Sequence, residues 1–547
     1  MADLYEIWEK YERSKEYMDK KGILYKTEKN WQMYIGEQWA ACEDSQGLEN
    51  LPMLNIIKPT VKYKVSTIAQ HAVTALFSSL NRAEDETIES LNKLFSISWE
   101  KAKMNRVAWN NLKNAAIQGD GYVYWGDGGD TRIQPQILHN TQVRLGDENI
   151  TKIQEQPWII IEERLSPKVV KERARLQGVP KDDIDLIQPD AYTNKELYNR
   201  QEVNDKITSL LYMEKDQKTG IISVARCTSL VMYEKFHPIQ QRKGDEYYGG
   251  GLTMYPIVPM IWEEVPNSAR GTSEVEQMIP NQLELNKTLA RRSMSVKMTA
   301  YPRLVVDDTT LVNPEDLDKV GGVIKLNGAN AQSINSMIAY LSPQAMSGDA
   351  KMLSDELLEQ TRTLAGASDA QLGNIDLSRV SGTAAQTIRD QQQVPLNEQV
   401  SMYQDFVENV ALLWFDLWKT YYPNGIEMDG IMVSAEEITG IIPNVRVDIA
   451  EDTTLSKMAA QQELTNLFNN NKITFEEYAM AYPENSSIPK ATFEQILMSR
   501  QMQMMQQPQM MFDEMGNPII NNDVDNGVAT GGASGGSYQS IQSQLAM

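Results

Sequence analysis

The chain has 547 residues, of which 41% are hydrophobic and 23% are charged, a composition typical of globular proteins. This length exceeds that of an ordinary single domain, so several sub-domains are expected. Asp and Glu number 74 against 52 Lys and Arg, which gives a formal net charge of −22. Such an acidic balance argues against a protein that grips nucleic acid by neutralising its phosphates.

Membrane, disulfide and metal classes are also disfavoured. No apolar run approaches the roughly 20 residues of a membrane span, and the charged N-terminus predicts no signal peptide. The two cysteines, Cys42 and Cys227, lie far apart in the sequence, which excludes a disulfide scaffold and fits a reducing cytoplasm. The three histidines form no close pair, so we expect no metal centre, and no cofactor is indicated.

The first half of the chain is predicted to pass from helices to strands. Residues 1–120 show apolar positions at helical spacing, and His71 falls on one of these predicted helices. Gly119 and Gly121 mark the change to a β-hairpin over 122–138. The remaining elements expected before residue 265 are a strand, a short helix and a second hairpin, over 156–165, 166–178 and 207–236.

Two long helices are predicted to bracket a β-rich insertion in the second half. The first covers 271–300, with Thr272 or Ser273 as its N-cap, and Pro280 either bends it or marks its start. The insertion covers 301–343, and the second helix covers 344–365.

The region after residue 366 is predicted to hold a polar loop and a very long helix. That helix runs from Thr383 to about Tyr421, with a kink at Pro395 and a regular apolar stripe beyond it. A strand over 444–450 follows. Short helices are expected over 453–507, and the Gly/Ser-rich residues 508–547 are expected to form a disordered tail.

Catalytic motifs do not assemble in this sequence. There is no G-x-x-x-x-G-K-[ST] loop to hold ATP phosphates. An S-x-x-K at 98–101 and a K-T-G at 218–220 lack the S-D-N element that a penicillin-binding enzyme would add. Glu162 and Glu163 are adjacent on a predicted strand, so they point to opposite faces and cannot share a proton. We therefore do not expect an enzyme.

Four stretches stand out by their order and spacing. They are PMLNIIKPTVKYKVSTI, NAAIQGDGYVYW, GTSEVEQMIPNQLELNKTLARR and NIDLSRVSGTAAQTI, at 52–68, 114–125, 271–292 and 374–388. Together they resemble the portal proteins of tailed bacteriophages. Members of that family form the ring at one vertex of the phage head through which DNA is packaged and ejected.

The resemblance implies an α+β, mainly helical fold with portal-like architecture. Its parts would be a wing, two stem helices, a clip that docks other components, a tunnel loop, a helical crown and a flexible C-terminal tail. The implied boundaries are 1–265 and 383–450 for the wing, 266–299 and 344–365 for the stem helices, 300–343 for the clip, 366–382 for the tunnel loop, 451–507 for the crown and 508–547 for the tail.

The resemblance also implies partners and a location. Family members assemble as closed homo-oligomeric rings, usually of twelve subunits, through which double-stranded DNA passes without sequence-specific contact. The implied partners are the terminase large subunit, which supplies the ATPase, the scaffold or major capsid protein, and head-completion adaptor proteins. The protein would reside in the virion at the portal vertex after assembly in the host bacterial cytoplasm, with no membrane contact.

Two groups of candidate site residues follow from this architecture. The stem basic cluster is expected to face the bore or a neighbouring subunit, or else to form a solvated helix face or salt bridges to Glu356 and Glu359; its members are Lys287, Arg291, Arg292 and Lys297. The tunnel loop is expected to contact DNA and shift as DNA passes, or else to be an ordinary connector. Its candidate residues are Asp369, Gly373, Asn374, Asp376, Ser378, Arg379 and Gly382.

Two other interpretations of the function stay open. The first is another head-morphogenesis or minor capsid protein, which would lack the helix–insertion–helix arrangement and need not form rings. The second is an unrecognised cytosolic enzyme, which would show a cluster of perturbed ionisable residues in a pocket.

Overall fold

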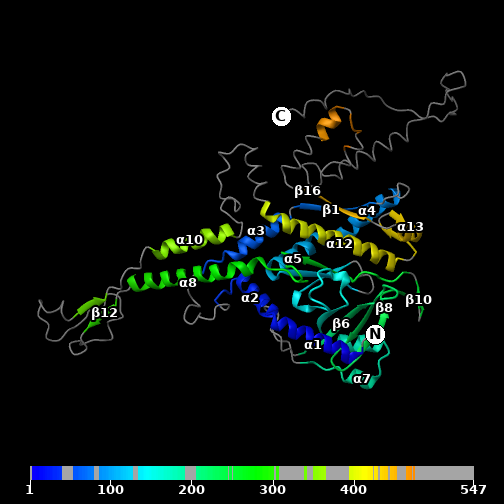
Figure 1. Ribbon diagram of the computed structural model, residues 1–547, viewed down its shortest axis with the longest axis horizontal. Helices are drawn as coiled ribbons and strands as arrows, with labels where there is room; N and C mark the ends of the chain where they lie inside the picture. The colour runs from blue at the N-terminus through cyan, green and yellow to red at the C-terminus, as the bar shows by residue number, and fades with distance from the viewer. Residues whose placement is uncertain are drawn as a thin grey trace, which may run out of the picture. The chain divides into compact units, whose positions relative to one another are not determined.

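The structure is a computed structural model in two units, Met1–Asp452 and Thr453–Met547 (Figure 1). In the second unit it describes residues 464–470, 472–474 and 478, of which 464–469 and 478 are helical. In the first unit the described residues are 3–39, 53–69, 71–78, 85–126, 134–190, 205–243, 246–248, 250–300, 303–306, 338–341, 349–364, 394–422, 424–428, 431–440 and 444–451.

The N-terminal part is largely helical, but it contains a strand that the sequence reading missed. The helices are α1 (Leu4–Lys20), α2 (Ile23–Ile35), α3 (Ile57–Ala69), α4 (Asp85–Lys101) and α5 (Met104–Gln118). The prediction that His71 lies on a helix is wrong, because β1 (His71–Ser78) is a strand. It pairs antiparallel with β16 (Asn444–Glu451), and a partner that distant in sequence leaves no local signal.

A three-stranded antiparallel sheet lies at the centre of the first unit. Its strand order is β11 (Ile257–Ile261), β2 (Asp120–Trp125) and β3 (Pro135–Leu138). The predicted hairpin over 122–138 is therefore confirmed, with Tyr122 opposite Leu138. All six residues of β2 are buried, as expected for a central strand with packing on both faces.

A five-stranded antiparallel sheet forms the second layer, in the order β4-β5-β6-β7-β8. The predicted second hairpin corresponds to β6, β7 and β8, because the chain turns once more at Thr228. The strands are β4 (Val143–Leu145), β5 (Trp158–Leu165), β6 (Ile207–Lys215), β7 (Ile222–Cys227) and β8 (Met232–Pro238). Short elements around this sheet are η3 (Asn140–Gln142), η4 (Ile153–Glu155), α6 (Pro167–Leu176), α7 (Lys181–Asp185), β9 (Gln241–Lys243) and β10 (Glu246–Tyr248).

The C-terminal helices return the chain to the N-terminal core. In Figure 1, α12 (yellow, Asn397–Tyr421) lies beside β1 and β16. The apolar stripe predicted on this helix is confirmed: Tyr403, Val407, Val410, Trp414, Leu417 and Tyr421 are buried. Trp414 contacts Phe95 and Trp99 of α4 and Trp125 of β2 with ring centroids 5.1–6.4 Å apart. One apolar core therefore joins residues from both halves of the sequence.

Pro395 lies in a 3₁₀ turn, η7 (Val394–Leu396), immediately before α12 begins at Asn397. Proline lacks the N–H that an α-helix interior requires, so α-helical bonding starts after it. The first part of the predicted long helix, up to residue 393, lies outside the described residues. The remaining elements are α8 (Glu274–Ala300), β12 (Arg303–Val306), β13 (Ile338–Leu341), α10 (Asp349–Leu364), β14 (Ile426–Met428), β15 (Ile431–Val433) and α13 (Ala435–Gly440).

The mixture of helices and antiparallel sheets confirms the α+β class. Among the residues that the structure describes, no helix has both the length and the apolar character needed to cross a bilayer.

Candidate functional site

The long helix α8 starts at a capped and anchored junction. The Ser273 hydroxyl accepts a hydrogen bond from the backbone N–H of Val275 at 3.0 Å, so Ser273 is the N-cap. The same hydroxyl donates to the carbonyl of Ile117 at 2.7 Å, which ties the cap to the end of α5. Pro280 lies inside α8 and does not mark its start. The N-terminus of α8 is therefore fixed by hydrogen bonds to the end of α5 and is not free in solvent.

Arg270, three residues before the cap, is the centre of a buried ionic network. Its guanidinium donates to both carboxylate oxygens of Glu148, at 3.0 and 3.1 Å, and to Asp120 at 3.1 Å. Two further bonds reach the carbonyls of Asn140 and Val143, at 2.9 and 2.7 Å. Burial alone would lower the pKa of Arg270, but the surrounding negative groups, Glu148 first, hold it well above its ordinary value. Arg270 therefore stays charged.

Two glycines allow two backbone segments of this junction to come into close contact. Gly119 has φ +98°, a conformation that side chains other than glycine rarely adopt. A Cβ at Gly119 would lie 2.4 Å from the carbonyl oxygen of Gly271, and a Cβ at Gly271 would lie 2.5 Å from that of Gly119. This spacing leaves no room for any side chain at either position.

The first turns of α8 are also fastened by side chains. The Glu274 carboxylate forms an ion pair with the Lys64 ammonium of α3 at 2.8 Å and accepts a hydrogen bond from the Trp262 indole N–H at 3.2 Å. Further along, the amide of Gln282 accepts from Ile56 N–H at 2.9 Å and donates to the Leu54 carbonyl at 2.7 Å. These contacts fix the helix direction relative to α3 and the segment before it.

The distal half of α8 runs beside α10 (Figure 1). The Arg292 guanidinium donates to the hydroxyl of Ser354 on α10 at 2.9 Å, and this serine is buried. Arg291 is exposed and lies 3.5 Å from Glu284 on its own helix. Of these two predicted basic residues, Arg292 therefore contacts α10, whereas Arg291 pairs within α8.

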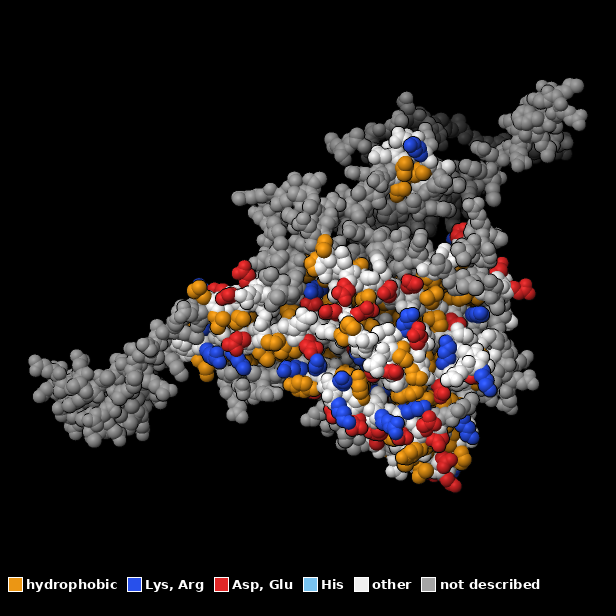
Figure 2. All heavy atoms as spheres, in the orientation of Figure 1, with side chains coloured by type: hydrophobic (Ala, Val, Ile, Leu, Met, Phe, Trp, Pro, Cys, Tyr) orange, Lys and Arg blue, Asp and Glu red, His pale blue; other side chains and the backbone are white. Residues whose placement is uncertain are grey.

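The other members of this cluster are placed as follows. Lys287 is half-buried, and Lys297 is exposed near the end of α8. Lys287 lies one helical turn before Arg291, as their spacing predicts. On the face drawn in Figure 2, acidic and basic side chains are interspersed, so no single sign of charge dominates there.

The predicted tunnel-loop residues all lie outside the described part of the chain. They are Asp369, Gly373, Asn374, Asp376, Ser378, Arg379 and Gly382. Most of the predicted clip also lies outside it. Within this predicted segment the structure describes β12 and β13, which pair antiparallel with Arg303 opposite Leu341.

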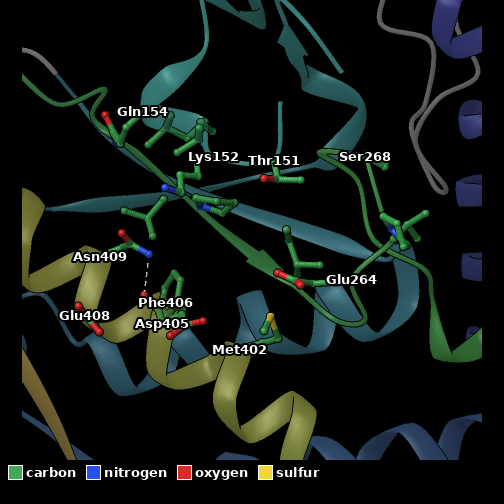
Figure 3. A pocket seen from close by; sticks show the side chains of 17 residues that line it. Thr151, Lys152, Gln154, Glu264, Ser268, Met402, Asp405, Phe406, Glu408 and Asn409 are labelled. Carbon is green, nitrogen blue, oxygen red and sulfur yellow. Dashed lines mark hydrogen bonds between the residues drawn. The ribbon is translucent and has the colours of Figure 1, made fainter. Parts of the chain in front are cut away.

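A groove of about 670 Å³ lies between α12, β11 and the residues around η4 (Figure 3). Asp405 and Glu408 line it from α12, with Glu264 from the segment after β11. Burial raises the pKa of Asp405, and burial followed by the charge of Asp405 raises that of Glu408. Lys152 also lines the groove, but its amine pairs with Glu155 at 3.4 Å. We call this feature the acidic groove.

The acidic groove does not have the composition of a catalytic site. Its lining residues include no His, Cys or Tyr, and the Ser268 hydroxyl already donates to the Arg270 carbonyl at 3.0 Å. It therefore offers no paired nucleophile and base. Within the described ranges, no group of three or more His, Cys, Asp or Glu side chains could hold a metal ion.

Comparison with known families identifies the chain. Residues 10–517 match the phage P22-like portal protein family. The chain belongs to this family. This match confirms the resemblance noted in the sequence. Because portal proteins are structural components, the alternative interpretation as an enzyme loses its support.

Other comparisons add little to this assignment. A search of curated proteins found no match. The neck of an empty gene transfer agent particle, computed with C6 symmetry, is similar over 78% of this chain and 90% of that one, at 10% identity and a TM-score of 0.31. The virion of a native gene transfer agent particle is similar over 78% and 89%, at 9% identity and a TM-score of 0.28. These low TM-scores carry no argument about this portal protein.

Sequence reasoning missed the buried network around Arg270. Arg270 follows Ser268 and Ala269 in what reads as a turn before a helix, so it looks like a solvated side chain. Its partners lie more than 100 residues earlier in the chain. The signal that could have found it is the pair of glycines, Gly119 and Gly271, which both precede helix or strand boundaries.

Proposed function

We propose that this portal protein assembles into a closed ring at the capsid vertex and forms the channel through which DNA is packaged and ejected. The observation that carries the proposal is the family match across residues 10–517. Head-to-tail contacts that close on themselves generate such a ring, and twelve copies are the number that the family resemblance implies.

The helix pair α8 and α10 fits the role of the stem. The chain leaves α8, passes through β12, returns through β13 and re-enters α10 beside α8. We assign 266–299 and 344–365 to the stem, and 300–343 to the clip that docks the terminase large subunit and head-completion adaptors. The wing would comprise 1–265 and 383–450, because β16 pairs with β1 and α12 packs in the same core.

The stem helices expose apolar side chains that suit contacts between subunits. Met294 and Val296 on α8 are 37% and 67% exposed, and Met352 and Leu353 on α10 are 70% and 44% exposed. Apolar area of this kind is stabilised when a neighbouring copy covers it. The four residues would therefore lie between adjacent stems in the ring.

The acidic charge suits a conduit. Twelve copies would carry a formal charge of about −260 before screening. DNA phosphates would then meet few counter-charges, and the duplex could slide because it is not held by many ion contacts. Lys287, Arg291 and Lys297 would supply limited basic contacts to the bore or to a neighbouring subunit.

The tunnel loop would contact the passing DNA. We assign this role to 366–382, whose glycines permit the backbone to rearrange. Gly373→Pro should impair DNA packaging more than ring assembly, because proline restricts the backbone without changing the stem. Equal loss of packaging and assembly would count against a gating role.

The other assignments complete the particle. The crown would comprise 451–507, and 508–547 would be a flexible tail. The ring would meet the scaffold or major capsid protein at the vertex, after assembly in the host cytoplasm. ATP hydrolysis would come from the terminase, because this sequence has no phosphate-binding loop.

Electron microscopy of the purified protein tests the central proposal. End-on views should show rings with a central hole. Val296→Glu with Met352→Glu should convert the rings to folded monomers, because two buried charges would oppose stem contacts. Leu176→Glu on α6 is the matched control, since Leu176 is 83% exposed and lies outside the stem. A wild-type chain that stays monomeric under all assembly conditions would overturn the proposal and favour a non-ring head protein.

A further inference from the structure

Two surfaces of the wing carry opposite charges that form no ion pair with a described residue. The first is the acidic groove. None of its three outer carboxylates, those of Asp405, Glu408 and Glu264, forms an ion pair with a described Lys or Arg. Partial burial raises the pKa of Asp405 and of Glu408, and an incoming cation would stabilise their charged forms.

The second surface, which we call the basic patch, lies on α3 and α5. It comprises Lys58 and Lys62, one turn apart on α3, with Arg106 and Lys113 on one face of α5. None of these four side chains has an ion pair with a carboxylate in the part of the chain that the structure describes. The ammonium of Lys113 lies 5.3 Å from the centre of the Trp109 ring.

The basic patch is electrostatically unfavourable in the isolated subunit. Burial lowers the pKa of Lys113, and the charge of Lys62 lowers it further. An anionic surface placed over Lys62 and Lys113 would relieve this repulsion.

We propose that the basic patch of one subunit docks into the acidic groove of the next subunit in the ring. This inference rests on the proposed function, because it requires a closed homo-oligomer. The occupant of the groove is thus a second copy of this chain, presenting Lys62, Arg106 and Lys113 to Asp405 and Glu408.

The walls of the groove suit this occupant. Apolar residues of β11 and α12, including Ile257, Met402 and Phe406, line the groove between its carboxylates. Lys and Arg bury their hydrocarbon stems against such surfaces while their charged ends reach polar groups. The volume of about 670 Å³ accommodates several side chains.

Charge complementarity favours a copy of this chain over another partner. Subunits of net charge −22 repel one another at long range, so a ring needs local contacts of opposite sign to bring neighbours into register. The groove and the patch are formed by different residues, so a groove-to-patch contact between two copies is heterologous, the type of contact from which closed rings are built.

Reciprocal charge reversal tests the docking. One variant carries Asp405→Lys and Glu408→Lys, and the other carries Lys62→Glu and Lys113→Glu. Sedimentation velocity should show at least a tenfold lower ring fraction for each variant alone. An equimolar mixture should regain rings, because each groove then meets a complementary patch on the other variant. The chain with all four substitutions should also form rings.

The control variants are Lys168→Glu and Glu172→Lys on α6, which reverse exposed charges away from both surfaces and should assemble like the wild type. Variants that assemble normally, or a mixture that stays monomeric, would overturn the docking. A wild-type chain that never forms rings would instead overturn the proposed function.

A second measurement needs no substitution. A zero-length carbodiimide reagent joins a lysine to a carboxylate only when they are in contact. Wild-type rings should yield peptides that join Lys62 or Lys113 to Asp405 or Glu408, and monomers should not. Rings that give none of these cross-links would reject the contact.

Discussion

The guanidinium of Arg270 binds Glu148 through two parallel hydrogen bonds, Nε to Oε2 at 3.0 Å and Nη2 to Oε1 at 3.1 Å. This bidentate pair joins the residues that lead into α8 to the loop after β4. The direction of the long helix therefore depends on a buried charge and not only on apolar packing.

Removing Arg270 should be strongly destabilising. Arg270→Ala leaves Asp120 and Glu148 buried without a counter-charge, which costs about 3–5 kcal/mol of unfolding free energy. Urea unfolding followed by tryptophan fluorescence measures the loss. Arg13→Ala is the control, because its pair with Glu9 is exposed, and it should cost less than about 1 kcal/mol. Similar losses for the two variants would contradict the network's role.

Neutralising the partners should recover part of that loss. Arg270→Met combined with Asp120→Asn and Glu148→Gln removes the charges together, so no buried ion stays unpaired. The triple variant should be more stable than Arg270→Ala in the same urea titration. A triple variant that is less stable would show that packing, and not charge, governs the site.

The glycine contact should tolerate no side chain. Gly119→Ala forces a Cβ into the carbonyl of Gly271 and strains a positive φ, which should cost about 1–3 kcal/mol. Gly126→Ala is the matched control at the other end of β2, because a Cβ there meets nothing within 4 Å. Thermal unfolding of both variants measures the difference, and equal melting temperatures would refute the steric argument.

Stability should fall at high pH because of Cys227. Burial raises the pKa of this thiol to about 12, whereas an unfolded cysteine has a pKa of about 8.5. The folded state keeps its proton where the unfolded state loses it, so stability is complete below about pH 8.5 and falls as pH rises toward 12.

The pH dependence of the unfolding free energy separates the contribution of the Cys227 thiol from that of other groups. Wild-type unfolding free energy should fall more steeply than that of Cys227→Ala between about pH 9 and 11, by about 1.4 kcal/mol per pH unit. Urea titrations under reducing conditions at several pH values provide the comparison. Parallel slopes would mean that water reaches the thiol in the folded state.

The two neighbouring arginines of α8 should behave differently. Arg292→Ala removes the hydrogen bond to Ser354, worth about 1.5 kcal/mol, so amides of α10 should exchange with solvent about tenfold faster. Arg291→Ala loses only an exposed pair with Glu284 and should leave that exchange unchanged. Hydrogen-exchange mass spectrometry distinguishes them, and equal protection in both variants would contradict the assignment of Arg292 to the helix pair.

The sequence alone was sufficient to predict the elements that depend on a local pattern of residues. The stripe from Tyr403 to Tyr421, a helix cap at Thr272 or Ser273 and the hairpin after Gly121 all follow from spacing, capping chemistry and turn residues. The family assignment also came from sequence order, because several loose motifs together are specific where each alone is not.

Contacts between distant residues needed the tertiary structure. Nothing near His71 predicts a strand, since β1 is stabilised by β16 more than 360 residues later. The Arg270 network, the Gly119–Gly271 contact and the acidic groove likewise bring together segments that are far apart in the chain. Local propensity acts over a few residues, whereas burial, ion pairing and steric fit depend on which segments meet in space, and that is the physical reason for the division.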